Sequence, residues 1–405
     1  MTHDTAQISR RRFLSSVGGG LAALVLAACG VGRSSSPTPG ISSPSATPSP
    51  TPSSPPTPSP TPAPSLRDRI GQMLLVGFRG LTVAQASEVV NDIRDLNLGG
   101  ILLFDTDQPT HSSVRNISSP SQLTALISGL QALARTPLLV AIDEEGGAVA
   151  RLDERHGFPP TYSAAQLGAR NDPTFTEAAG RKIARTLKSV GVTLNLAPVV
   201  DLNVNPDNPI IGALGRSFSA EPALVTAQAE AFIAGHQAVA VKTTLKHFPG
   251  HGSSTGDTHL GVVDVTSTWS RKELTPFANI IGDGKADAVL TAHVFNATLD
   301  PAHPATLSQP TITGILRQQL GWDGLVLSDD MQMGAIRKAY GYADALRLAI
   351  QAGIDVLTIA QQQVYQPGIV TTTIDIIEGL VRAGTLSEAR IDESYARIMA
   401  FKGAA

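Results

Sequence analysis

The chain has 405 residues, 42% of them hydrophobic, and a formal net charge of -3. This length allows one large domain or two small ones, and the charge gives no electrostatic basis for binding nucleic acid or an anionic membrane surface. The single cysteine excludes an intrachain disulfide bond.

The first 28 residues have the features of an export signal. Residues 9–14 read SRRRFL, which is typical of a twin-arginine signal, and a short apolar run follows at residues 21–28. This run is too short to span a bilayer. Residues 26–29 read LAAC and resemble a bacterial lipobox. We therefore expect a signal peptide over residues 1–28 and an exported protein anchored by a lipid on Cys29 to the outer face of the cytoplasmic membrane or the cell envelope. The alternative is a buried N-terminal helix with a chance cysteine.

Residues 29–65 follow as a linker that is nearly all Pro, Ser, Thr, Gly and Ala. Such a segment has little apolar surface to bury, so we expect it to be extended and disordered. In a polyproline II conformation, about 35 residues reach on the order of 100 Å. The linker would therefore separate a folded domain from a membrane.

Residues 66–405 alternate short apolar runs with longer amphipathic stretches, which predicts parallel strands joined by helices. Eight strands fit a closed (β/α)8 barrel of the TIM type. The alternative is an open doubly wound sheet, but no Gly-x-Gly-x-x-Gly follows the first strand. The expected strands are Met73–Phe78, Gly100–Phe104, Leu138–Asp143, Leu194–Asp201, Val241–Phe248, Ala288–Val294, Gly324–Asp329 and Asp355–Ile359. The expected helices are Val83–Leu96, Pro120–Ala134, Thr174–Val190, Pro222–Ala238, Thr311–Gln319, Ala343–Ala352 and Thr371–Arg382.

Polar side chains end five of the expected strands, where a barrel gathers its loops and its active site. One such residue is often only a turn or a helix cap, but five indicate a shared site. They are Asp143, Asp201, the pair Lys246 and His247, His293, and the pair Asp329 and Asp330.

The densest polar segment reads KHFPGHG at residues 246–252 and is followed by Asp257 and His259. His247 and His251 have the i, i+4 spacing of zinc ligands on a helix, but a proline and two glycines disfavour a helix there, so we expect no metal. In an extended loop, Asp257 and His259 would point to the same side. The carboxylate would then fix the imidazole tautomer and form a proton-transfer unit. The alternative is an ordinary surface turn.

In these motifs the chain resembles the bacterial β-N-acetylhexosaminidases of glycoside hydrolase family 3, of the NagZ type and in a lipoprotein form. The resemblance rests on four segments in family order. They are DEEGG at 143–147 with Arg151, IGALGRSF at 211–218, KHFPGHG at 246–252 with the later Asp-x-His, and GLVLSDDMQM at 324–333. One departure is Ala148, which stands where many relatives carry arginine.

The resemblance implies a retaining exo-β-N-acetylglucosaminidase that hydrolyses terminal β-linked GlcNAc through a covalent glycosyl-enzyme, with peptidoglycan-derived fragments as substrates and without a cofactor. Asp329 would be the nucleophile, with Asp330 as the alternative. His259 would be the general acid/base, held by Asp257. The residues that would grip the terminal sugar are Asp143, Arg151, Arg216, Lys246 and His247.

The implied chemistry is reasonable on physical grounds. A carboxylic acid needs a strongly raised pKa to remain a proton donor at neutral pH, whereas the ordinary pKa of histidine already lies near neutrality. Two alternatives remain open: a phosphorylase that uses phosphate in place of water, and a sugar-binding lipoprotein without turnover. The expected partners are a carbohydrate substrate and, through the lipid alone, a membrane.

Overall fold

The computed structural model describes residue 40 and residues 64–403. The predicted signal peptide, Cys29 and all but a few residues of the predicted linker lie outside the described residues. Among the described helices, none combines the length and the apolar character needed to cross a membrane.

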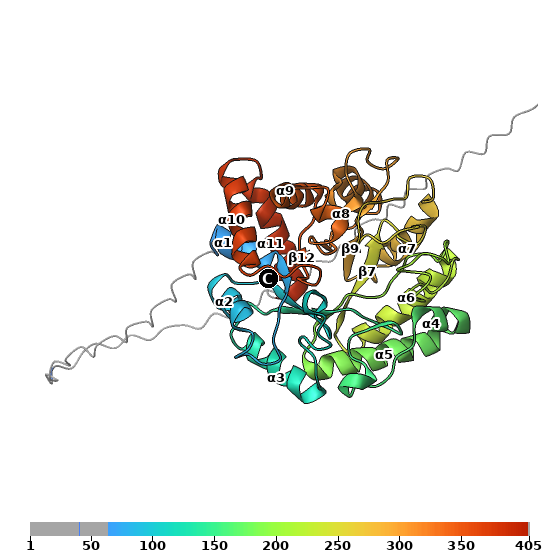
Figure 1. Ribbon diagram of the computed structural model, residues 1–405, viewed down its shortest axis with the longest axis horizontal. Coiled ribbons are helices and arrows are strands. Elements are labelled where there is room, and N and C mark those ends of the chain that lie inside the picture. Colours follow the sequence, from blue (N-terminus) through green and yellow to red (C-terminus); the bar gives the residue numbers. More distant parts are fainter. Residues whose placement is uncertain (1–39, 41–63, 404–405) are drawn as a thin grey trace, which may run out of the picture. The chain divides into compact units, whose positions relative to one another are not determined.

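The described chain forms a barrel of parallel strands ringed by helices (Figure 1). The strands follow one another around the barrel in chain order, from β12 through β1 to β11. A bridge between Leu327 and Val356 joins the first and last of them, so the sheet closes on itself. The predicted (β/α)8 barrel is confirmed, and the open sheet is excluded. The barrel strands are β1 Leu74–Gly77, β2 Gly100–Leu103, β3 Leu139–Ile142, β6 Leu194–Asn195, β7 Lys242–Phe248, β9 Ala288–Thr291, β11 Leu325–Leu327 and β12 Leu357–Ile359.

Each expected helix is present with ends shifted by a few residues. The main outer helices are α2 Ser87–Asp95, α3 Pro120–Gln131, α5 Pro173–Val190, α6 Pro222–Gln237, η5 Pro310–Gln319 (a π-helix), α9 Tyr342–Ala352 and α10 Ile369–Arg382. Helix α5 illustrates why the ends lie where they do. Asp172 caps its first turn, Pro173 is preorganised for the first helical position, and Gly191 ends it with a φ of 93°.

Several elements were not predicted from the sequence. The helices among them are α1 Leu66–Gln72, α4 Ala164–Arg170, α7 Thr275–Gly282, α8 Gly334–Arg337 and α11 Glu388–Lys402. The 3-10 turns are η1 Gln108–Thr110, η2 Glu154–His156, η3 Arg271–Leu274 and η4 Ala305–Leu307. Short strands β4 Glu144–Gly146 and β5 Val149–Ala150 pair with each other, as do β8 Val263–Asp264 and β10 Val294–Phe295.

The fourth expected strand is much shorter than predicted. The sequence predicts Leu194–Asp201, but regular pairing ends at Asn195. Pro198 has no N–H to donate to a ladder, so regular pairing does not continue through it. The chain still bonds to β7 beyond Asn195, because the Thr244 N–H donates to the Ala197 carbonyl at 2.9 Å and Val199 bridges to Lys246. This path carries Asp201 to the end of the barrel where the other polar strand ends gather.

The strands are apolar along their length because they are buried on both faces. All four residues of β1, β2 and β3 are buried. Just before β12, the fully buried Asp355 forms ion pairs with Arg317 at 2.6 Å, Arg390 at 3.3 Å and Arg397 at 3.2 Å. Two of these arginines lie on α11, so this cluster fastens the C-terminal helix under the barrel.

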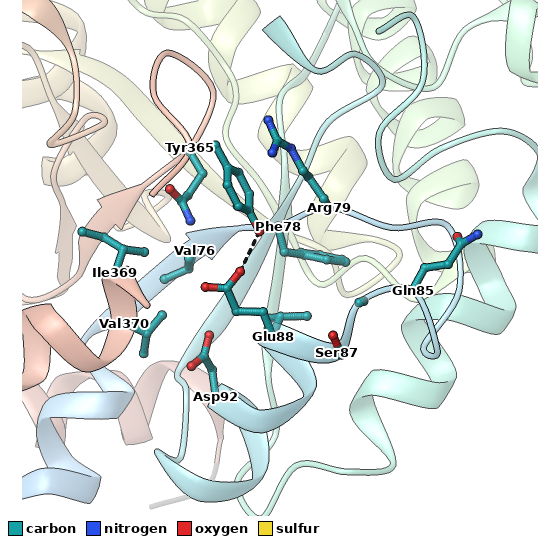
Figure 2. A pocket seen from close by; sticks show the side chains of 14 residues that line it. Val76, Phe78, Arg79, Gln85, Ser87, Glu88, Asp92, Tyr365, Ile369 and Val370 are labelled. Carbon is teal, nitrogen blue, oxygen red and sulfur yellow. Dashed lines mark hydrogen bonds between the residues drawn. The ribbon is translucent and has the colours of Figure 1, made fainter. Parts of the chain in front are cut away.

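A small cavity of about 130 Å³ lies beside the barrel between β1, α2 and α10 (Figure 2). Glu88 there accepts a hydrogen bond from the Tyr365 hydroxyl at 2.8 Å. Asp92, one turn further along α2, also lines the cavity and is only 9% exposed. Burial, followed by the charges of Glu88 and Asp95, raises the pKa of the Asp92 carboxyl to about 7. A carboxylate at this position therefore destabilises the fold when it is ionised.

We predict that Asp92→Asn stabilises the protein at alkaline pH. The unfolded carboxyl ionises above its ordinary pKa of about 3.9, whereas the folded one holds its proton up to about 7. Wild-type stability therefore falls as pH rises between these two values, and above them the variant gains on the order of 4 kcal/mol. Thermal unfolding near pH 5 and near pH 8 measures the difference.

Asp283→Asn, at the exposed residue that follows α7, serves as the control for that measurement. A gain from Asp92→Asn that is the same at both pH values would contradict the account, because a change in packing alone does not follow the titration of the carboxyl.

Candidate active site

The predicted site residues in the described chain line one cavity at the C-terminal end of the barrel. Its volume is about 450 Å³. Strand ends and the loops that follow them supply these side chains, as a barrel active site requires. The predicted residues in its lining are Asp143, Arg151, Arg216, Lys246, His247, Asp257, His259 and Asp329.

A network of four charges occupies one side of the cavity, with Lys246 and Glu145 buried and Asp143 and Arg216 partly exposed. Lys246 at the end of β7 donates from Nζ to Asp143 Oδ1 at 2.5 Å and lies 2.8 Å from Glu145 Oε1. Arg216 donates to both oxygens of Glu145, from Nε at 2.8 Å and from Nη2 at 2.7 Å. Glu145 was missed from the sequence, although it links two of the predicted sugar-binding residues.

The network keeps its charges at neutral pH. Burial by itself raises the pKa of Glu145, but Arg216 and Lys246 outweigh it and hold that pKa far below the ordinary value. Burial lowers the pKa of Lys246, but Asp143 and Glu145 outweigh it, so the net pKa is raised. The cavity therefore presents fixed N–H donors beside a carboxylate acceptor, a set suited to the hydroxyl groups of a sugar.

Asp201 orients His247. This fully buried carboxylate lies 2.6 Å from His247 Nδ1 and also accepts the backbone N–H groups of His247 and His251. The carboxylate places the ring proton on Nδ1, so Nε2 of His247 is free to accept. Arg216 Nη2 lies 3.4 Å from it. Asp201 was not among the predicted site residues, although the sequence places it among the polar residues that end the expected strands.

His251 and His293 are structural neighbours of this cavity. Burial lowers the pKa of His251 to about 4, and its ring nitrogens contact the hydroxyls of Ser254 at 2.7 Å and Thr258 at 3.3 Å. His293 bonds to the Thr306 hydroxyl and to the Asp330 carbonyl. Within the described residues, no group of three or more His, Cys, Asp or Glu side chains is placed to hold a metal ion.

Asp257 and His259 meet as predicted, but through a turn and not through an extended loop. Asp257 Oδ1 lies 2.7 Å from His259 Nδ1 and accepts the backbone N–H of His259 at 2.8 Å. This local turn brings residues i and i+2 together because the carboxylate bonds to both the backbone and the ring. The His259 side chain is 48% exposed, so its remaining nitrogen is open to the cavity.

Helix α8 supports the loop that carries His259. The N–H groups of Gly334 and Ala335 donate to the carbonyls of His259 and Thr258, each at 3.1 Å. A Cβ at position 334 would lie 2.6 Å from the His259 carbonyl oxygen. Glycine is therefore required at this position for the loop and helix to approach so closely.

The two carboxyl groups after β11 have different environments. Burial raises the pKa of Asp329, but the nearby imidazoles of His293, His247 and His259 outweigh it, so its net pKa is lowered. Asp330 accepts the N–H groups of Gln332 and Ala360, both at 3.0 Å, and burial raises its pKa to about 6. Asp329 thus stays ionised in the cavity, while Asp330 is tied to the backbone.

Arg151 lies at the rim, where part of its side chain has no partner. Its Nη1 is 3.6 Å from Asp105 Oδ1, and its backbone N–H donates to Glu144 at 2.8 Å. In the described part of the chain, Arg151 Nε and Asp105 Oδ1 are buried without a hydrogen bond. Ala148 lies in the exposed turn between β4 and β5, away from the cavity lining.

The sequence and the fold both match known glycoside hydrolases. The model of the glycosyl hydrolase family 3 N-terminal domain matches residues 65–401. A β-hexosaminidase of Xylella fastidiosa is 37% identical over 298 residues, which cover 72% of this chain and 84% of that protein. The β-hexosaminidase LpqI of Mycobacterium tuberculosis is 33% identical over 349 residues, which cover 84% of this chain and 83% of that protein.

Solved structures give the same result. The β-N-acetylhexosaminidase of Beutenbergia cavernae superposes with a TM-score of 0.75 at 31% identity, over 84% of this chain and 99% of that one. A family 3 β-N-acetylglucosaminidase of Paenibacillus superposes with a TM-score of 0.76 at 35% identity, over 84% of this chain but only 63% of that one.

Proposed function

The chain belongs to glycoside hydrolase family 3, and from this we propose that it is a retaining exo-β-N-acetylglucosaminidase. The observation that carries the proposal is the arrangement of two units in one cavity. Asp329 is an ionised carboxylate, and the Asp257–His259 pair is a proton-transfer unit. The β-hexosaminidases among its relatives support the same activity.

The reaction follows from these positions. The Asp329 carboxylate attacks the anomeric carbon while His259 donates a proton to the leaving oxygen, so the glycosidic bond breaks as the ester bond forms. His259, now neutral, accepts a proton from water as that water attacks the anomeric carbon and releases Asp329. Asp257 stabilises the protonated imidazole in the first step and orients its ring in both.

The charge network would hold the terminal sugar. Asp143, Lys246 and Arg216 offer fixed polar groups, and His247 is oriented by Asp201. These groups would bind the hydroxyls of one terminal sugar, which explains an exo mode of cleavage. We assign the acetamido-sugar from the names of the relatives, since that preference follows from the family and not from a contact in this cavity.

We further propose that the enzyme acts outside the cytoplasmic membrane on peptidoglycan-derived fragments, tethered by a lipid on Cys29. The export signal and lipobox of the sequence support this location. The Pro- and Ser-rich linker would give the barrel reach from the membrane surface.

For the anchor, we predict that Cys29→Ala moves the protein from the membrane fraction to the soluble exported or precursor pool, because the lipid has no other attachment site. Fractionation followed by immunoblotting measures the distribution. An unchanged membrane fraction would exclude the lipid anchor.

For the acid/base, we predict that the effect of His259→Ala depends on the leaving group. A sugar alkoxide needs the proton, whereas nitrophenolate hardly does. Hydrolysis of a β-linked disaccharide should therefore fall by about 10²–10⁴-fold, the usual range for general acid–base catalysis. Formation of the glycosyl-enzyme from p-nitrophenyl β-GlcNAc should change far less. Pre-steady-state release of nitrophenol measures this step.

Azide provides the decisive control for this variant, because it attacks the intermediate without losing a proton. It should restore turnover of the aryl substrate by His259→Ala and give the β-glycosyl azide. Asp257→Ala should show a weaker form of the same pattern. Equal slowing for good and poor leaving groups, with no effect of azide, would mean that His259 is not the proton donor.

A further inference from the structure

An open groove of about 770 Å³ adjoins the active-site cavity. The two share five lining residues: Gln108, His259, Leu260, Gln362 and Gln363. The shared His259 indicates on which side of the scissile bond the groove lies. A proton donor must face the leaving oxygen, so the groove that continues beyond His259 lies on the leaving-group side of the scissile bond.

The side of the groove next to His259 is built by α8 and the residue that follows it. Arg337, the last residue of α8, and Lys338 both line the groove and are exposed. Lys338 donates from Nζ to the Leu260 carbonyl at 2.8 Å, which ties it to the loop of His259. Arg337 makes no side-chain hydrogen bond or ion pair with any described residue. Its guanidinium is therefore free to meet a ligand.

The groove has no free negative charge of its own. Asp107 is the acidic residue in its lining, and that carboxylate is 2.8 Å from Arg79 Nε and 3.6 Å from Arg115 Nη1. Its charge is thus already paired with two arginines. The groove therefore presents Arg337 and Lys338 as uncompensated cations.

We propose that Arg337 is a specificity-determining residue, which with Lys338 recognises a carboxylate on the leaving group of the substrate. This inference rests on the proposed glycosidase function and extends it to the far side of the scissile bond. An arginine fork matches a carboxylate with two parallel hydrogen bonds, which a solvated lysine does not. Inorganic phosphate shares this anionic chemistry, so the same cations would also favour phosphate as an acceptor.

Two disaccharides separate the charge of the leaving group from its shape. Both carry a terminal β-1,4-linked GlcNAc. The reducing sugar of the first bears a carboxylic acid in an ether side chain at O3, and the second bears the methyl amide of that acid. The wild-type enzyme should prefer the acid by about two- to fivefold in kcat/KM, the size expected of an exposed charge pair. Added salt should reduce the preference.

Arg337→Gln should remove this preference through the acid substrate alone, with the loss mainly in KM, and leave the amide and p-nitrophenyl β-GlcNAc unchanged. The matched control is Arg185→Gln on α5. Arg185 is likewise exposed and makes no ion pair in the described chain, but it does not line the cavity or the groove. It should behave as wild type on all three substrates.

The outcomes are distinguishable. Inactivity of the wild type toward p-nitrophenyl β-GlcNAc would contradict the proposed function itself. An active wild type without a preference for the acid, or an Arg337→Gln variant that keeps the preference, would overturn the role of Arg337. The last assays add inorganic phosphate and measure formation of sugar 1-phosphate. If wild type then yields sugar 1-phosphate and Arg337→Gln does not, while the acid preference persists, the groove binds the acceptor and not the leaving group.

Discussion

The charge network at the ends of β3, β4 and β7 is the constraint on which the site depends. Removing an ion from water costs several kcal/mol, and a buried pair offsets this only when its geometry satisfies both partners. Glu145 meets that condition by accepting two hydrogen bonds from Arg216 and one ion pair from Lys246. Asp143 completes it, since Lys246 lies within 2.5 Å of its carboxylate. The same four charges fix the donors and the acceptor that meet the sugar.

The site also separates its titratable groups by environment. Asp329 and Asp330 are neighbours in sequence, yet imidazoles lower the pKa of the first and burial raises that of the second to about 6. His259 lies on an exposed turn, held by Asp257 on one side and by α8 on the other. A fixed carboxylate on a strand end and a proton donor on a supported loop are the two parts that double displacement needs. At the opposite end of the barrel, the Asp355 cluster is equally ionic but only stabilises the fold.

The barrel and most of the site could be predicted from the sequence for physical reasons. Parallel strands buried on both faces leave long apolar runs, so each of the eight barrel strands lies within a predicted run. The polar residues at the ends of those runs include Asp143, Lys246, His247 and Asp329, which were therefore predicted as site residues. The site residues that were missed depend on side-chain contacts between segments far apart in the sequence. Glu145 acquires its role from Arg216, 71 residues away.

Other misses have local causes. The expected fourth strand ended early because Pro198 interrupts the ladder. The support that Gly334 gives to the His259 loop depends on a close approach of two backbones, which no spacing of residues in the sequence predicts.

The most direct test of the account is covalent trapping with an activated fluorosugar analogue of β-GlcNAc. The account predicts one glycosyl adduct per chain, mapped by peptide mass spectrometry to Asp329 and absent in Asp329→Ala. An adduct on Asp330, or hydrolysis with inversion at the anomeric carbon, would contradict it.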